Sequence, residues 1–247
     1  MAGHSKWANI KFRKAAQDAK RGKLFTKLIR EITVAARAGG GDSASNPRLR
    51  AAVEKALAGN MTRDTVDRAI KRGTGELEGV SYEEVRYEGY AHGGVAVLVD
   101  CTTDNRNRTV GEVRHLFSKH GGNLGTEGSV AYLFSKIGLF VFAPTVDEET
   151  VMEVVVAAGA EEVETALDGS TEVITTPELF DTVRAALAQE RLEPEIAQIV
   201  QRPATETELD GDDARKVVSL VDALEEMDDV QDVFTNASFP AEMAASG

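Results

Sequence analysis

Residues 139–175 read LFVFAPTVDEETVMEVVVAAGAEEVETALDGSTEVIT, and this stretch decides the fold class. Its apolar runs and its valines at helical spacing predict a strand, a helix and two further strands. The sequence that follows adds one more helix and one more strand. Residues 137–201 therefore have the order βαββαβ, which is typical of a ferredoxin-like domain. The expected strands are 139–142, 162–166, 171–175 and 196–200, and the expected helices carry Val151–Ala158 and, after Thr176-Pro177, Phe180–Leu187.

The sequence on either side of this unit is incomplete by itself. Residues 80–136 predict three strands but a single helix, and the residues after 201 predict two strands around one helix. Together these two segments supply a second ferredoxin-like α+β layer, into which the 137–201 unit is inserted. The expected strands are Val85–Tyr90, Val95–Val99, Val130–Phe134, Thr205–Leu209 and Val230–Thr235, and the expected helices carry Val110–Phe117 and Val217–Leu224.

Three short helices precede the first strand. The first carries Phe25–Ala36, the second opens at Asn46-Pro47, and the third is capped by Thr62. The predicted fold class is α+β, with an N-terminal basic arm, a small three-helix domain and two ferredoxin-like domains, the third inserted into the second. The predicted domains are 1–79, 80–136 together with 202–240, and 137–201.

Charge divides the chain into two very different parts. Residues 1–75 hold 17 Lys and Arg against 6 Asp and Glu, although the whole chain has a net charge of −13. A basic surface of this extent favours contact with a phosphate backbone, because neutralised phosphates release their counterions. A second interpretation stays open, in which the basic end docks on the acidic remainder of the same chain or of another copy.

The segment before residue 24 is basic and has few large apolar side chains, so it predicts a loose arm that orders on a partner. Trp7 either stacks on a base or anchors the arm to the body. Residues 104–108, DNRNR, form a loop before a helix that Thr109 and Glu112 would cap as a capping box. Because Arg106 and Arg108 have no obvious local carboxylate, they are candidates for a phosphate site, the alternative being a loop that satisfies its own backbone.

Two other features have both a functional and a structural explanation. The glycines of residues 121–128 allow a ligand to approach the backbone closely, or they form a helix end and a hairpin. Val130, Tyr132 and Phe134 alternate as the aromatic face of an RNA-binding sheet would. Core packing explains this alternation better, because no basic–aromatic RNA-binding motif accompanies it.

The sequence gives little support for catalysis. The four histidines lack metal-ligand spacing, phosphate- and dinucleotide-binding glycine motifs are missing, and Cys101 is expected to be a buried, inert thiol. We therefore predict a non-enzymatic protein with no cofactor, no metal and no small-molecule substrate. One cysteine, no long apolar stretch and no secretory signal predict a cytoplasmic protein without a membrane span.

Several motifs, in order along nearly the whole chain, closely resemble the YebC/PmpR family. They are MAGHSKWANI (1–10), RKAAQDAKR (13–21), NMTRD (60–64), YEGY (87–90), DNRNRTV (104–110) and GGNLGTEGSVAYLFS (121–135). Phe12 differs from the histidine that is usual in this family, which puts a phosphate contact at that position in doubt. The resemblance implies three domains with a cleft between them and a cytoplasmic protein.

The resemblance also implies a function. Family members are generally described as DNA-binding transcriptional regulators, whereas mitochondrial relatives look like translational activators and bacterial ones have been linked to ribosomes. The expected function is thus a DNA-binding transcription regulator, with a ribosome-associated translation factor that contacts rRNA or tRNA as the alternative. The residues expected to contact nucleic acid are Lys6, Trp7, Lys11, Arg13, Lys14, Lys20, Arg21, Lys23, Arg63, Arg106 and Arg108.

Overall fold

The structure, a computed structural model, describes residues 21–166 and 169–239. The chain forms two compact units, and each is considered by itself. Within the described residues, one unit comprises 21–131 and 215–235 and the other comprises 132–214 and 236–239. The fold class is α+β, as predicted. The three predicted domain boundaries stay a prediction, because the helical segment and the first sheet belong to the same compact unit.

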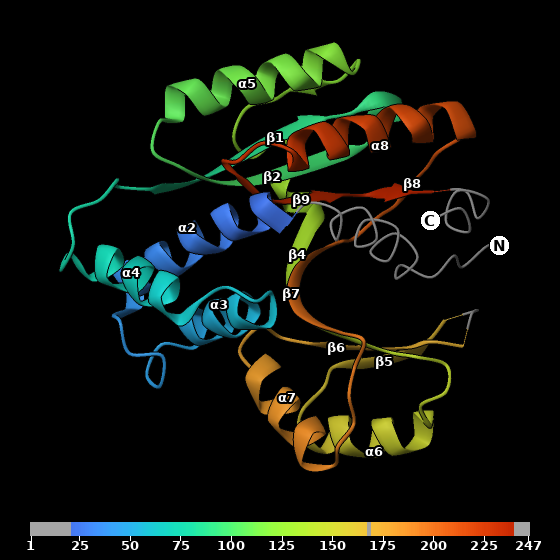
Figure 1. Ribbon diagram of the computed structural model, residues 1–247. Helices are drawn as coiled ribbons and strands as arrows, with labels where there is room; N and C mark the ends of the chain where they lie inside the picture. Colours follow the sequence, from blue (N-terminus) through green and yellow to red (C-terminus); the bar gives the residue numbers. More distant parts are fainter. Residues whose placement is uncertain (1–20, 167–168, 240–247) are drawn as a thin grey trace. The chain divides into compact units, whose positions relative to one another are not determined.

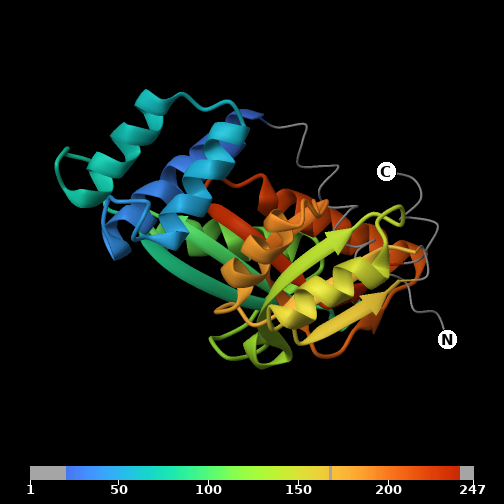
Figure 2. The same cartoon turned by 90° about the horizontal axis from the view of Figure 1, so that it is seen from below.

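The first unit begins with three helices, which Figure 2 shows grouped together. They are α2 (Arg21–Gly39), α3 (Pro47–Ala58) and α4 (Arg63–Thr74). Asn46 and Thr62 cap α3 and α4 as predicted, each accepting a backbone N–H from the first turn. The helices bury a shared core whose members include Leu28, Ile32 and Leu49. Sequence periodicity therefore predicted this bundle correctly.

A four-stranded antiparallel sheet follows, in the order β3-β1-β2-β9. Its strands are β1 (Glu83–Tyr90), β2 (Ala96–Thr103), β3 (Asn123–Leu124) and β9 (Val230–Thr235), and its helices are α5 (Arg106–Lys119) and α8 (Gly211–Glu225). Both helices lie along one side of the sheet (Figure 1). The strand that lies between β3 and β2 is β1, which comes first in the chain. Apart from this early position of β1, the strand order is that of a ferredoxin-like sheet. The second ferredoxin-like layer is thereby confirmed.

The inserted unit has the predicted βαββαβ order. It consists of β4 (Phe134–Phe142), α6 (Glu148–Ala157), β5 (Glu162–Thr165), β6 (Thr171–Thr175), α7 (Phe180–Gln189) and β7 (Ile196–Pro203). Its antiparallel sheet has the ferredoxin-like order β5-β6-β4-β7, and α6 and α7 lie on the same side of it (Figure 1). Phe140 stacks on Phe180 at 4.7 Å between ring centroids, and both belong to the core beneath the helices.

Two of the predicted strands are wrong in part. The segment expected as a strand at 130–134 forms a 3₁₀ turn at Ala131–Leu133, and β4 starts only at Phe134. The reason is that the buried Glu88 carboxylate accepts the N–H groups of Val130 and Ala131, each at 2.8 Å, so these amides cannot pair with a neighbouring strand. The strand expected at 205–209 is only Thr207–Glu208 (β8), which pairs in parallel with Ala237–Ser238 (β10).

Candidate nucleic-acid interface

The predicted interface begins in residues that the structure does not describe. Lys6, Trp7, Lys11, Arg13, Lys14 and Lys20 lie outside the described residues, as does the side chain of Arg21, whose backbone starts α2. The choice between a stacking and an anchoring role for Trp7 therefore stays open. The remaining predicted residues, Lys23, Arg63, Arg106 and Arg108, can be placed.

One basic stripe of α2 is engaged within its own unit. Lys23 and Lys27 donate from Nζ to the main-chain carbonyls of Glu226 and Glu225, at 2.7 and 2.9 Å. These carbonyls lie at the carboxyl end of α8, where the helix dipole favours a cation. Burial lowers the pKa of Lys27, while nearby carboxylates, that of Glu225 first, act in the opposite direction. The α2 stripe thus contacts the acidic part of the chain, which was the second interpretation of the basic end.

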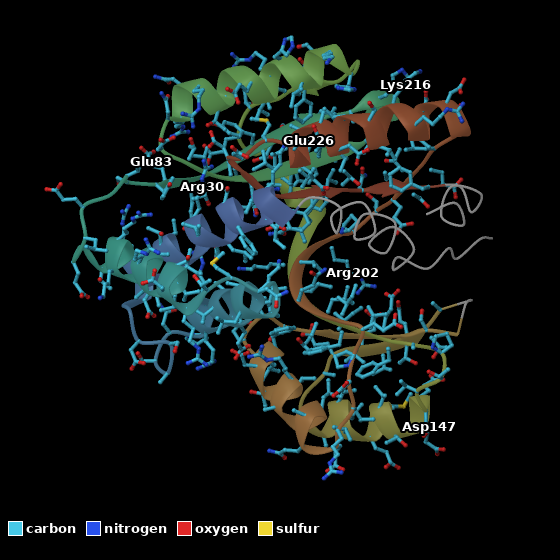
Figure 3. All side chains as sticks on the ribbon, in the orientation of Figure 1. Arg30, Glu83, Asp147, Arg202, Lys216 and Glu226 are labelled. Atoms are coloured by element: carbon cyan, nitrogen blue, oxygen red, sulfur yellow. The ribbon has the colours of Figure 1, made fainter. Side chains whose placement is uncertain are left out.

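Arg30 continues this stripe one turn later and reaches a buried carboxylate. Its Nη1 is 2.6 Å from Asp229 Oδ1 and donates to the carbonyls of Asp228 and Thr102 at 2.6 and 3.0 Å. Its guanidinium also lies over the ring of Tyr82, 5.4 Å from the centroid. Figure 3 labels Arg30 and, at the end of α8, Glu226. The Arg30 side chain therefore makes structural contacts within its own unit.

Asp229 connects α2, β2 and α5. Besides Arg30, its carboxylate binds Arg108 Nη2 at 2.7 Å and the hydroxyls of Thr109 and Thr103 at 2.6 and 3.1 Å. Burial alone would raise the pKa of Asp229, but the hydrogen bonds from Arg108, Thr109 and Arg30 lower it to about 2. The side chain is only 5% exposed, so it is a buried anion satisfied by two guanidinium groups.

Two predictions about the DNRNR segment are wrong. The helix α5 begins at Arg106, and its N-cap, Asn105, lies four residues before the expected N-cap Thr109, which is buried and binds Asp229. Arg108 does have carboxylate partners, since its Nη2 also lies 2.7 Å from Asp104. Sequence reasoning missed Asp229 because it lies more than 100 positions away. The only local signal was an aspartate directly before an apolar strand.

Arg63 and Arg106 are exposed at the first turns of α4 and α5. Lys71 and Arg72 extend the basic surface of α4, as predicted. None of the four forms an ion pair within the described part of the chain. Arg68, on the same helix, is bound to Asp64 one turn earlier. In the described part of the chain, α4 and the start of α5 therefore offer exposed cations to an external anion, as do Lys55 on α3 and Arg114 and Lys119 further along α5.

The glycine-rich segment after α5 is ordered by Glu88 of β1. The Glu88 side chain is buried, and its carboxylate accepts N–H bonds from Gly128 at 2.7 Å and from Val130 and Ala131 at 2.8 Å. Burial opposes ionisation of Glu88, but these three hydrogen bonds hold its pKa below the usual value. Tyr132 follows this loop and is 74% exposed. The preferred interpretation of the alternation, core packing, holds for Val130 and Phe134, which are buried, but not for Tyr132, which lies in the 3₁₀ turn.

Features of a catalytic centre are scarce in the described residues. Residues 21–166 and 169–239 contain no cluster of three or more His, Cys, Asp and Glu side chains suited to a metal. Cys101 is buried, as expected, and burial raises the pKa of its thiol to about 12. A pocket of about 420 Å³ between α5 and α8 is lined in part by Lys23, Glu112 and His115. The helices in these same residue ranges include none with the length and apolarity of a membrane span.

Comparison with known proteins covers nearly the whole chain. Residues 5–76 match the family model described as the TACO1/YebC protein N-terminal domain, and residues 82–237 match the TACO1/YebC second and third domain. A protein of Nitrosococcus oceani named "probable transcriptional regulatory protein" is 62% identical over 245 residues, covering 99% of both chains. A protein of the same name from Francisella tularensis is 59% identical over 243 residues, covering 98% of both chains.

A solved structure is also similar to this chain. It is that of a conserved hypothetical protein from Aquifex aeolicus, which has 50% sequence identity and a TM-score of 0.80. The similarity covers 90% of this chain and 92% of that one. The α+β arrangement described above is thus shared with an independently solved relative.

Proposed function

We propose that this chain, which belongs to the TACO1/YebC family, is a nucleic-acid-binding regulator of gene expression. It acts on DNA in transcription. The proposal includes a cytoplasmic location and no catalytic activity. Relatives that match over the full length are named probable transcriptional regulatory proteins. The name of a relative gives a role but no contact surface, so the surface is argued from charge.

The observation that carries the proposal is how the basic residues are distributed between internal and external contacts. Lys23, Lys27 and Arg30 are hydrogen-bonded to the carboxyl end of α8 and to Asp229, so their side chains are held by contacts within their own unit. Arg63, Lys71 and Arg72 are exposed on α4. The sequence adds Lys6, Lys11, Arg13, Lys14 and Lys20 before α2. Exposed cations on α4, together with a preceding sequence rich in Lys and Arg, are suited to a phosphate backbone.

The test is a set of single charge reversals in the full-length chain. Lys11→Glu, Arg13→Glu and Lys14→Glu are each expected to weaken nucleic-acid binding by about tenfold, because each removes a phosphate contact and adds a repulsion. Lys136→Glu, which reverses an exposed cation on β4 of the inserted unit, is the matched control and should have little effect. Equal losses for all four variants would contradict the proposed surface.

A ribosome-associated translation factor that contacts rRNA or tRNA is the second candidate. It is favoured by the absence of a base-reading set at the starts of α3 and α4. Arg48 of α3 is bound to Glu31 and Glu84, which leaves Arg63 of α4 as a single exposed arginine outside an ion pair at these two helix starts. Direct readout needs Arg, Asn or Gln side chains free to reach base edges. Contacts to the backbone alone suit a structured RNA as well as a duplex.

Cross-linking in cells separates the two candidates. The full-length chain is cross-linked, and both the DNA and the RNA recovered with it are sequenced. Enrichment of promoter DNA is expected for the transcriptional role. Recovery of rRNA and tRNA without promoter DNA would reject that role and support the translation factor.

A further inference from the structure

The sheet of the inserted unit has a second apolar face that its own helices do not cover. Successive residues of a strand point to opposite faces. Phe140 and Phe142 of β4 pack with α6 and α7, which lie on the same side of the sheet (Figure 1). Leu139 and Val141 alternate with these two phenylalanines along β4. They form a separate cluster on the opposite face together with Ile174 and Ile196. All four are buried, with at most 5% of each exposed.

The same face is acidic along one edge. Glu162 of β5 is paired in register with Ile174, and Glu164 is paired with Glu172 of β6. The three carboxylates therefore share the face of Ile174, and Glu172 is only 4% exposed. Arg202 of β7, labelled in Figure 3, reaches this edge with Nη1 2.6 Å from Glu162 and Nη2 3.7 Å from Glu164. The edge thus already binds a guanidinium, so its chemistry suits a basic partner.

We propose that this face, defined by Leu139, Val141, Ile174, Ile196 and the three glutamates, is the docking site of residues 1–20 of the same chain. That segment combines large apolar side chains with an excess of cations, which matches both parts of the face. The segment directly precedes α2, and twenty residues can span up to about 66 Å when extended. The matching side chains are Trp7, Ile10 and Phe12, and Lys6, Lys11, Arg13, Lys14 and Lys20.

Docking would regulate the proposed function. The cations that the face attracts are the ones proposed to bind nucleic acid, so the two partners compete for the same segment. This regulatory consequence rests on the proposed function, whereas the docking itself does not. Weakening the face is expected to release the segment and to tighten nucleic-acid binding.

The experiment uses Trp7, the single tryptophan of the chain. Its fluorescence in the nucleic-acid-free, full-length protein reports whether the segment is docked. The test variant is Glu162→Gln with Glu164→Gln, which removes both charges without repelling Arg202. The control is Glu149→Gln with Glu153→Gln, which removes two exposed charges from α6, on the helix side of the sheet.

In the wild-type protein, Trp7 emission should be blue-shifted relative to the urea-unfolded chain and protected from acrylamide. The test variant should shift the emission to the red and weaken docking by about tenfold, since each lost ion contact contributes modestly. The control should match the wild type. The Trp7 emission should not depend on protein concentration, because the contact lies within one chain.

Three results would overturn the proposal. They are wild-type emission like that of the unfolded chain, equal emission for test and control variants, and emission that changes on dilution, which would indicate a second copy. Circular dichroism of each variant checks folding. The fluorescence is measured without nucleic acid, so a failure of the proposed function would leave this result unaffected. Conversely, docking without tighter nucleic-acid binding by the test variant would reject only the competition.

Discussion

Asp229 joins three elements of the first unit. Its buried carboxylate joins Arg30 of α2 to Arg108 and Thr109 of α5, and the N–H of Thr102 donates to its carbonyl at 2.8 Å. A buried ion pair contributes little net stability when complete, but it is costly to break, because the remaining charge is left without a partner. Asp229 therefore helps to hold α2 to the sheet.

Replacing Asp229 with asparagine should lower the free energy of unfolding by about 3 kcal/mol at neutral pH, since two guanidinium groups lose their anion. The measurement is urea denaturation followed by circular dichroism. Asp228→Asn, one residue earlier and exposed, is the matched control and should change stability by less than about 0.5 kcal/mol. Similar losses for both variants would contradict the role given to Asp229.

Asp229 should also contribute to acid sensitivity. Its pKa is about 2 in the folded protein, below the ordinary value of 3.8 that the unfolded chain has. A pKa that is lower in the folded protein adds stability at pH values above the pKa of the unfolded chain. That stability is lost as the pH falls through about 2. The stability difference between wild type and Asp229→Asn should therefore shrink between about pH 4 and pH 2. A constant difference across this range would show that the carboxylate is not the source.

Glu88 controls the loop before β4. Glu88→Gln should cost about 2 kcal/mol, because a neutral amide cannot accept all three N–H bonds and its NH₂ group would face backbone donors. Hydrogen exchange should accelerate at Gly128, Val130 and Ala131. Amides of α4, which Glu88 does not contact, are the internal reference. Unchanged protection at the three loop positions would contradict this explanation of the 3₁₀ turn.

At the level of elements, α2 and α4 approach each other closely at Gly73. A Cβ on Gly73 would lie 2.4 Å from the carbonyl oxygen of Thr33 and 2.7 Å from the Ala36 side chain. Neither is a flexible side-chain end, so the helices would have to separate. Gly111, in the exposed part of α5, has nothing within 4 Å of its Cβ position. Close packing therefore excludes a larger side chain at Gly73 but not at Gly111.

Gly73→Ala should destabilise the protein by about 2 kcal/mol through overpacking between α2 and α4. Gly111→Ala should stabilise it by about 0.5–1 kcal/mol, because alanine loses less entropy in a helix and meets no neighbour. Thermal or urea unfolding of both variants measures the pair. Two changes of the same sign would contradict the close contact at Gly73.

At the level of the whole molecule, charge separation predicts a strong dependence of nucleic-acid binding on salt. The logarithm of affinity should fall linearly with the logarithm of salt, with a slope of about −0.9 per phosphate contacted on duplex DNA and about −0.7 on a single strand. Titration at several salt concentrations measures the slope. Arg13→Glu should reduce its magnitude by about one contact. A flat dependence would reject an ionic interface.

Local patterns determined much of this molecule from the sequence alone. Alternation and helical spacing in residues 137–201 predicted the βαββαβ unit, and Asn46 and Thr62 predicted two helix starts, because such signals depend on neighbours within a few positions. The charge imbalance of residues 1–75 is equally a property of the sequence.

Only the tertiary structure decided which of those charges are engaged. It placed Asp229 between Arg30 and Arg108, brought the carboxyl end of α8 to Lys23 and Lys27, and gave the amides of Val130 and Ala131 to Glu88. These partners are about 40 to 200 positions apart in the chain. Hydrogen bonds and ion pairs act over a few ångströms in space, so a pattern of neighbouring residues cannot reveal them.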